Sequence, residues 1–117
     1  MSNNKIAILG LGYVGLPLLQ AFSKFYDVIG FDISAKRIKD LQTSFTKNNK
    51  SYINDVILTS KKSKLSDADI YIITVPTPLN EDNSPDLSQI KSATELVAEH
   101  LNKGNIVIYE STVYPGV

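Results

Sequence analysis

Four short, mainly apolar runs recur along the chain, at residues 6–9, 28–31, 70–75 and 106–109. None of them alternates apolar with polar positions. Unbroken apolar runs of this length are typical of strands that are buried on both faces of a parallel sheet. A further run at 56–59 predicts a short edge strand.

The segments between these runs have helical spacing. A first helix is expected after Gly15, with Pro17 in its first turn, where the N–H that proline lacks would have no helical partner. Its apolar face would consist of Leu18, Leu19, Phe22 and Phe25. Ser34 is placed to cap a second helix, which would bury Ile38 and Leu41.

The third helix has the clearest pattern. Gly104 follows it as a stop signal. One apolar stripe is formed by Leu87, Ile90, Ala93, Val97 and Leu101, and the opposite side carries Lys91, Glu95, Glu99 and Lys103.

By contrast, the stretch 43–64 is polar and basic with little periodicity, so we predict a surface loop there. Strands that alternate with helices in this way predict a single doubly wound α/β domain with a parallel sheet.

Composition restricts the class of protein. The chain has 117 residues, 43% of them hydrophobic, and twelve basic groups balance twelve acidic ones. This is the composition of one globular domain, and zero net charge gives no support to nucleic-acid binding. No apolar run is long enough for a membrane span or a signal peptide, so we expect a cytoplasmic protein with no membrane partner. The absence of cysteine and the single His100 argue against disulfides, a cysteine nucleophile or a metal site in this chain.

The first motif with chemical meaning is a glycine-rich turn between the first strand and the first helix. It reads Gly10, Leu11, Gly12, Tyr13, Val14 and Gly15. In such a turn the first glycine allows a tight bend, the second lets a pyrophosphate approach the backbone, and the third permits close packing. The free N–H groups at the helix start then face the phosphates. The alternative is a tight turn that binds no ligand.

The second motif is Asp32, at the end of the second strand. A carboxylate at this place accepts hydrogen bonds from the adenosine ribose and repels a 2′-phosphate, which favours NAD over NADP. A helix cap or a turn is the alternative role for Asp32. Arg37 follows five residues later, within reach of the same ribose. Its alternatives are an exposed cation or a partner for the 2′-phosphate of NADP.

Two further segments follow strand ends. Thr74, Val75, Pro76, Thr77 and Pro78 come after the third run, and a strand that enters a Pro-x-Pro sequence must stop and turn. Small polar residues, including Ser111 and Thr112, follow the fourth run within 110–116. Each segment alone predicts only a polar turn. The acidic residues Asp67, Asp69, Asp82 and Asp86 fit turn and cap roles, and His100 fits a helix end.

Taken in order, these motifs resemble the N-terminal NAD-binding domain of the UDP-glucose/GDP-mannose dehydrogenase family. The most specific parts are 10–17, 75–78 and 110–116. The ending Tyr-Glu-Ser-Thr-Val-Tyr-Pro-Gly is similar to the UDP-N-acetylhexosamine 6-dehydrogenases of surface-polysaccharide synthesis. The resemblance implies a Rossmann-type fold and NAD as cofactor. It also implies that residues 10–15 hold the pyrophosphate, Asp32 and Arg37 the ribose, and 74–77 with Ser111 and Thr112 the nicotinamide side.

The resemblance further implies a reaction. Such enzymes oxidise the C6 alcohol of a UDP-sugar to a carboxylate with two NAD, the second step passing through a thioester on a cysteine. Family members carry a second α/β domain with that cysteine and the sugar site. We therefore expect this chain to be the cofactor domain of a larger two-domain enzyme, a homo-oligomer when complete, with no catalytic residue of its own and no activity alone. The rival hypotheses are a stand-alone dinucleotide-binding sensor domain and a β-hydroxyacid-type dehydrogenase.

Overall fold

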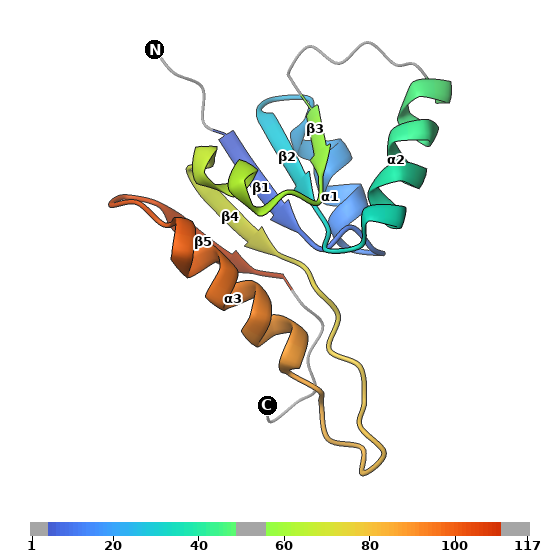
Figure 1. Ribbon diagram of the computed structural model, residues 1–117, viewed down its shortest axis with the longest axis vertical. Coiled ribbons are helices and arrows are strands. Elements are labelled where there is room, and N and C mark those ends of the chain that lie inside the picture. Colours follow the sequence, from blue (N-terminus) through green and yellow to red (C-terminus); the bar gives the residue numbers. More distant parts are fainter. Residues whose placement is uncertain (1–4, 49–55, 111–117) are drawn as a thin grey trace.

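The computed structural model describes residues 5–48 and 56–110, and shows one parallel sheet with helices on both faces (Figure 1). The strands are β1 (Lys5–Leu9), β2 (Asp27–Phe31), β3 (Val56–Thr59), β4 (Ile70–Ile73) and β5 (Ile106–Tyr109). They pair in the order β3-β2-β1-β4-β5, and every pair is parallel. The doubly wound α/β prediction is therefore confirmed. The strand order reverses between β2 and β4, on either side of β1, which is where such sheets bind ligands.

The helices are α1 (Gly15–Phe22), α2 (Ala35–Asn48) and α3 (Ser88–His100), with a 3-10 helix, η1 (Lys62–Asp67), between β3 and β4. Helices α1 and α2 lie against one face of the sheet and α3 with η1 against the other, so the buried side chains form two clusters (Figure 1). On the first face are Ile6, Ile8, Leu11, Leu19, Val28, Ile38, Leu41 and Ile72. On the second are Ala7, Leu9, Ile29, Phe31, Leu65, Ala68, Tyr71, Ile73, Ala93 and Val97.

Close packing of α1 on the sheet depends on a glycine within a strand. A Cβ on Gly30 of β2 would lie 2.4 Å from the Leu19 side chain of α1 and 2.9 Å from that of Leu58. Real Cβ atoms do not approach other atoms so closely, so any larger residue would push α1 or β3 away. Gly30 therefore lets the first helix sit directly over β2, which fixes where that helix begins at the end of β1.

The prediction of a surface loop over 43–64 was wrong at both ends of that stretch. Helix α2 continues to Asn48, and η1 occupies Lys62–Asp67. Polar composition does not prevent a helix when no glycine or proline interrupts it, and the sequence from 35 to 48 contains neither. The other helix predictions hold for their cores. The Ser34 hydroxyl accepts a hydrogen bond from the Arg37 amide at 3.1 Å, as expected of a cap.

The prediction that β5 is buried on both faces was wrong. Ile106 is 53% exposed and Tyr109 50%, and Ile108 is exposed as well. Strand β5 is an edge strand with α3 on one side, and no described element packs against its other side (Figure 1). Three residues at the ends of the predicted apolar stripes are also exposed, because they lie beyond the helix ends: Leu87 and Leu101 of the third helix and Phe25 of the first.

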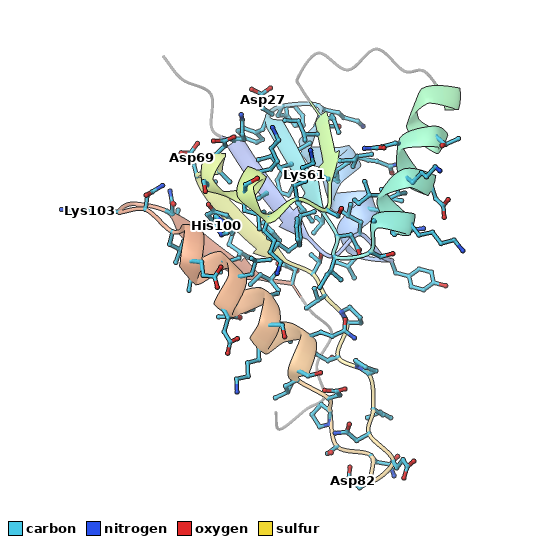
Figure 2. The ribbon with its side chains drawn as sticks, in the orientation of Figure 1. Asp27, Lys61, Asp69, Asp82, His100 and Lys103 are labelled. Atoms are coloured by element: carbon cyan, nitrogen blue, oxygen red, sulfur yellow. The ribbon has the colours of Figure 1, made fainter. Side chains whose placement is uncertain are left out.

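Between β4 and α3 the chain forms a long loop that extends beyond the sheet, with Asp82 near its far end (Figure 2). Leu79 and Pro85 form an isolated antiparallel bridge at its base. Hydrogen bonds from the Ser84 side chain and backbone lower the pKa of Asp82. Asp86 likewise accepts a bond from the Ser88 amide at the start of α3, and hydrogen bonds from Ser88 lower its pKa. These are the turn and cap roles expected for both carboxylates.

Candidate functional site

The glycine-rich turn lies at the carboxyl end of the central strand. The Gly10 amide donates to the Phe31 carbonyl at 2.8 Å, which extends the β1–β2 pairing into the turn. Gly10 has φ +98°, and a Cβ there would lie 2.9 Å from the Val75 backbone nitrogen. Glycine is required at this position for both its conformation and its space. The turn therefore passes directly over the end of β4.

The second glycine has a different environment. A hypothetical Cβ on Gly12 meets no atom within 4 Å, so this position faces open space. A Cβ on Gly15 would instead lie 1.8 Å from the Gly10 carbonyl oxygen and 2.6 Å from the Thr74 hydroxyl. Gly15 thus serves packing within the turn, and Gly12 leaves the backbone accessible from outside. This is the division of roles that the motif predicts for a phosphate-binding turn.

Helix α1 starts with unsatisfied donors. It has no side-chain cap and no acidic residue in its first turn. Among the described residues, no acceptor bonds the amides of Gly12, Tyr13 or Val14, and the Tyr13 side chain is fully exposed. Free N–H groups and the positive end of the helix dipole together favour an anion. The helix start is therefore suited to a phosphate group.

Asp32 lies at the end of β2 with its carboxylate directed at the turn. One oxygen accepts from the Leu11 amide at 3.0 Å and the other from the Ser34 amide at 2.9 Å. The bond to Ser34 is the turn role that the sequence offered as the alternative to ribose binding. The bond to Leu11 shows that the side chain also contacts the glycine loop. A carboxylate has about four acceptor positions, so these two bonds leave capacity for the hydroxyls of a ribose.

Arg37 lies in the first turn of α2, and its guanidinium also reaches the glycine loop. Nε and Nη2 both donate to the Leu11 carbonyl oxygen, at 3.0 and 2.9 Å. Leu11 itself is fully buried. Sequence reasoning placed Arg37 near the ribose, and the structure shows that Arg37 and Asp32 both bond to the backbone of Leu11.

The third motif forms the other wall of the site. Thr74 is buried, and its hydroxyl lies 2.5 Å from the Gly10 carbonyl oxygen and 2.9 Å from that of Leu9. Strand β4 ends at Ile73, earlier than predicted, so the turn begins at Thr74. Val75 and Thr77 are half-buried, and Pro76 is exposed. Ser111 and Thr112, predicted for the same side, lie outside the described residues.

A cavity of about 340 Å³ opens between the strand ends and α3. This volume is within the range of small-molecule sites. Its lining is mainly apolar, with a few polar groups around it: Leu9, Gly10, Phe31, Asp32, Ile33, Lys62, Val75, Pro76, Ser88, Gln89, Ser92, Ala93 and Leu96. Asp32 thus connects the glycine turn with an adjacent slot, as a site for a nucleoside beside a pyrophosphate requires.

Sequence reasoning missed part of this lining. Lys62 lies in the stretch 43–64, for which the sequence predicted only a surface loop, and the polar residues Ser88, Gln89 and Ser92 of α3 were not considered. The right-handed crossover from β4 to β5 carries the start of α3 to the carboxyl edge of the sheet. That rule, applied to the polar positions in the first turns of the third helix, is the signal that could have found them.

Comparison with known proteins agrees with this geometry. Residues 4–117 match the model of the UDP-glucose/GDP-mannose dehydrogenase family, NAD binding domain. The chain belongs to this family. The match covers nearly the whole chain, so the family's NAD-binding domain accounts for all of the described fold, and NAD is its cofactor.

Among relatives of this dehydrogenase domain, UDP-N-acetyl-D-glucosamine 6-dehydrogenase of Salmonella typhi is 47% identical over 118 residues. That alignment covers 96% of this chain and 28% of the relative. The solved structure of the UDP-D-ManNAc dehydrogenase from Pyrococcus horikoshii superimposes with a TM-score of 0.84 at 35% identity, covering 96% of this chain and 29% of that one. Cap5O, the UDP-N-acetyl-mannosamine dehydrogenase of Staphylococcus aureus, gives 0.78 at 32% identity, covering 96% and 30%.

The chain therefore spans a little under a third of the length of the relatives it matches. Within the described ranges, no helix is long and apolar enough to cross a membrane. The same residues contain no cluster of acidic and histidine side chains that could hold a metal ion. The residues that are present fit NAD: an open backbone at Gly12, free amides at the start of α1, and a carboxylate beside an apolar slot.

Proposed function

We propose that this chain is the cofactor domain of an enzyme that oxidises the C6 alcohol of a UDP-N-acetylhexosamine to the carboxylate. The observation that carries the proposal is the joint placement of Gly12, the uncapped start of α1 and Asp32 at one edge of the sheet. The choice of sugar rests on the relatives, whose names specify UDP-N-acetyl-glucosamine and UDP-N-acetyl-mannosamine.

Each residue has a defined task in this proposal. The amides of residues 12–14 and the dipole of α1 bind the pyrophosphate. Asp32 accepts the ribose hydroxyls and opposes a 2′-phosphate, which selects NAD over NADP. The slot beside Val75 and Pro76 excludes water from the adenosine. The turn at 74–77, with Ser111 and Thr112, faces the nicotinamide.

The cofactor, when bound, supplies a hydride acceptor. Oxidation of a primary alcohol to a carboxylate removes four electrons, so it consumes one water and reduces two NAD to NADH. The second oxidation needs a nucleophile, and this chain contains no cysteine. We therefore assign that nucleophile and the sugar site to a further part of the protein, and expect this chain alone to bind NAD without oxidising a sugar.

A chimera tests the proposed role as a cofactor domain. The matching N-terminal part of the Salmonella typhi enzyme is replaced by this chain, and NADH formation is followed with UDP-N-acetylglucosamine. We expect the chimera to reduce NAD, because this chain supplies the cofactor site and the remainder of that enzyme supplies the sugar site. A folded chimera that forms no NADH would contradict the cofactor role. The choice of sugar is tested on the protein encoded by the whole gene, assayed with UDP-N-acetylglucosamine, UDP-N-acetylmannosamine and UDP-glucose, and oxidation of UDP-glucose alone would contradict it.

A binding measurement on the chain itself provides the control for folding and cofactor. NAD at 100 times its Kd stabilises a protein by about 2.7 kcal/mol, which raises the melting temperature by several degrees. A folded chain whose melting temperature is unchanged at millimolar NAD would contradict the cofactor role in this chain. Sequencing the gene beyond codon 117 would show directly whether a cysteine-containing domain follows.

A further inference from the structure

We propose that Arg37 is a positioning residue that sets the pyrophosphate loop in its binding conformation before the cofactor arrives, and that this is a role distinct from contact with the ribose. The inference rests on the proposed NAD site and deepens it. It starts from a single acceptor: Nε and Nη2 of Arg37 both donate to the Leu11 carbonyl oxygen, at 3.0 and 2.9 Å.

The two peptide groups that flank Leu11 are held separately. Asp32 accepts from the Leu11 amide, which belongs to the peptide joining Gly10 and Leu11. Arg37 binds the Leu11 carbonyl, which belongs to the peptide joining Leu11 and Gly12. The Leu11 side chain is fully buried under α1 and α2. Leu11 is therefore fixed at its amide, its carbonyl and its side chain.

The carbonyl attachment has a direct consequence for the next residue. A peptide group is planar, and none of the described peptide bonds is cis, so the C=O and N–H of one group point in opposite directions. When Arg37 holds the Leu11 oxygen on the α2 side, the Gly12 amide is directed away from α2. Gly12 is the position in the loop that faces open space. Arg37 thus determines the orientation of a donor that it does not touch.

Without this bond, the loop has little to prevent rotation of that peptide. The Gly12 carbonyl accepts from the Leu16 amide at 3.2 Å, which holds the far side of Gly12. Its near side has no side chain, and glycine has unusual freedom in φ and ψ. Binding to a loop that samples several conformations is weaker, since only the competent fraction binds. A preformed loop avoids that loss.

The planar guanidinium is suited to this task, and a lysine ammonium would not replace it. Two N–H groups in fixed geometry converge on one oxygen, whereas an ammonium at the end of a flexible stem offers a point charge. A role in general attraction of phosphates would be satisfied by either cation. The comparison between Arg37→Lys and Arg37→Gln therefore separates positioning from charge.

The test uses the chain with three probes, NAD, ADP and adenosine, whose affinities are measured by ligand-observed NMR. ADP carries the pyrophosphate, and adenosine has the ribose without it. We expect Arg37→Gln and Arg37→Lys to weaken NAD and ADP each by about tenfold, as loss of a charge-assisted bond would, and adenosine by less than twofold. The control is Lys36→Gln, which removes an exposed charge from the same helix and should change none of the three.

A second measurement requires no ligand. The heteronuclear NOE of the Gly12 amide in the free chain should fall in both Arg37 variants and stay unchanged in Lys36→Gln, while the melting temperatures remain close to that of the parent chain. A parallel loss for adenosine would instead make Arg37 a ribose ligand, and an Arg37→Lys variant with parental affinity and NOE would reduce its role to charge. If the parent chain binds none of the probes, the proposed function fails, and the NOE comparison still decides whether Arg37 orders the loop.

Discussion

The Thr74 hydroxyl at the end of β4 lies 2.5 Å from the carbonyl oxygen of Gly10, in the turn that follows β1. It is also 2.9 Å from the Leu9 carbonyl, which already accepts from the Thr74 amide at 2.8 Å. A hydroxyl has one proton to donate. Since the Leu9 oxygen already has the amide as a donor, the Gly10 oxygen is the acceptor that relies on the Thr74 hydroxyl. This bond ties the glycine turn to the neighbouring strand, from 64 residues away in the sequence.

Replacing Thr74 by valine keeps the shape of the side chain and removes the donor. The Gly10 carbonyl then loses its partner in a partly buried position, which costs about 1–3 kcal/mol. We expect a corresponding decrease in the free energy of unfolding, measured by urea denaturation. Thr74→Ser keeps the hydroxyl and is the matched control. Equal stability of the valine and serine variants would show that the bond contributes nothing.

The two glycines of the turn should respond differently to the same added methyl group. In Gly15→Ala, the new Cβ would lie 1.8 Å from the Gly10 carbonyl oxygen, so the backbone must move, at a cost of roughly 3 kcal/mol or more. In Gly12→Ala the Cβ meets nothing within 4 Å, and we expect a stability change within about 0.5 kcal/mol but at least tenfold weaker NAD binding. Thermal melts with and without NAD distinguish the two outcomes. Unfolding of Gly12→Ala would make Gly12 a structural residue.

Because Tyr71 is buried, we predict that the free energy of unfolding decreases at alkaline pH. It is fully buried, and its hydroxyl donates to the Leu65 carbonyl. Burial, with a smaller contribution from the nearby Asp67 and Asp69 carboxylates, raises the pKa of Tyr71. The unfolded chain then loses its phenolic proton more readily than the folded one, so the stability that Tyr71 contributes is complete below about pH 10 and decreases above it.

The Tyr71→Phe variant tests this relationship. It should lose about 1 kcal/mol at neutral pH, because the hydrogen bond to Leu65 is gone. It should also show a shallower loss of stability above pH 10, measured by urea denaturation across the pH series. Tyr13→Phe is the control, since the Tyr13 side chain is fully exposed. A variant at position 71 with the same alkaline slope as the parent would show that another group causes the slope.

Much of this fold could be predicted from the sequence because its central strands are buried on both faces. The runs at 6–9, 28–31 and 70–73 have no polar position to accommodate, so apolar residues mark them directly. The glycine turn could also be predicted from the sequence, because Gly10 and Gly15 occupy positions where no larger residue fits. Sequence alone could not show how β5 would be covered, because exposure of Ile106 depends on which elements pack beside it.

The roles of polar residues were harder to predict. Asp32 and Arg37 were expected at a ribose, and both are bonded to the backbone of Leu11. Such contacts join residues that are 21 and 26 positions apart and depend on the exact path of the turn, which spacing does not reveal. Helix α2 was predicted too short for a related reason. The residues after Leu41 show no apolar periodicity that would indicate a helix. The structure shows a contact there that the pattern does not reveal, in which the Gln42 side chain donates to the Leu58 carbonyl at 2.9 Å.

Asp32→Asn should change the selectivity between the two nicotinamide cofactors. The carboxylate accepts from the Leu11 and Ser34 amides through different oxygens, whereas an asparagine has one acceptor oxygen and turns its NH₂ group toward one of these donors. We expect NAD affinity to fall about tenfold, and NADP affinity to fall less, because repulsion of the 2′-phosphate is also removed. Calorimetric titration with both cofactors measures the ratio, and Asp40→Asn on the exposed side of α2 controls for net charge. Equal losses for NAD and NADP would limit Asp32 to holding the loop.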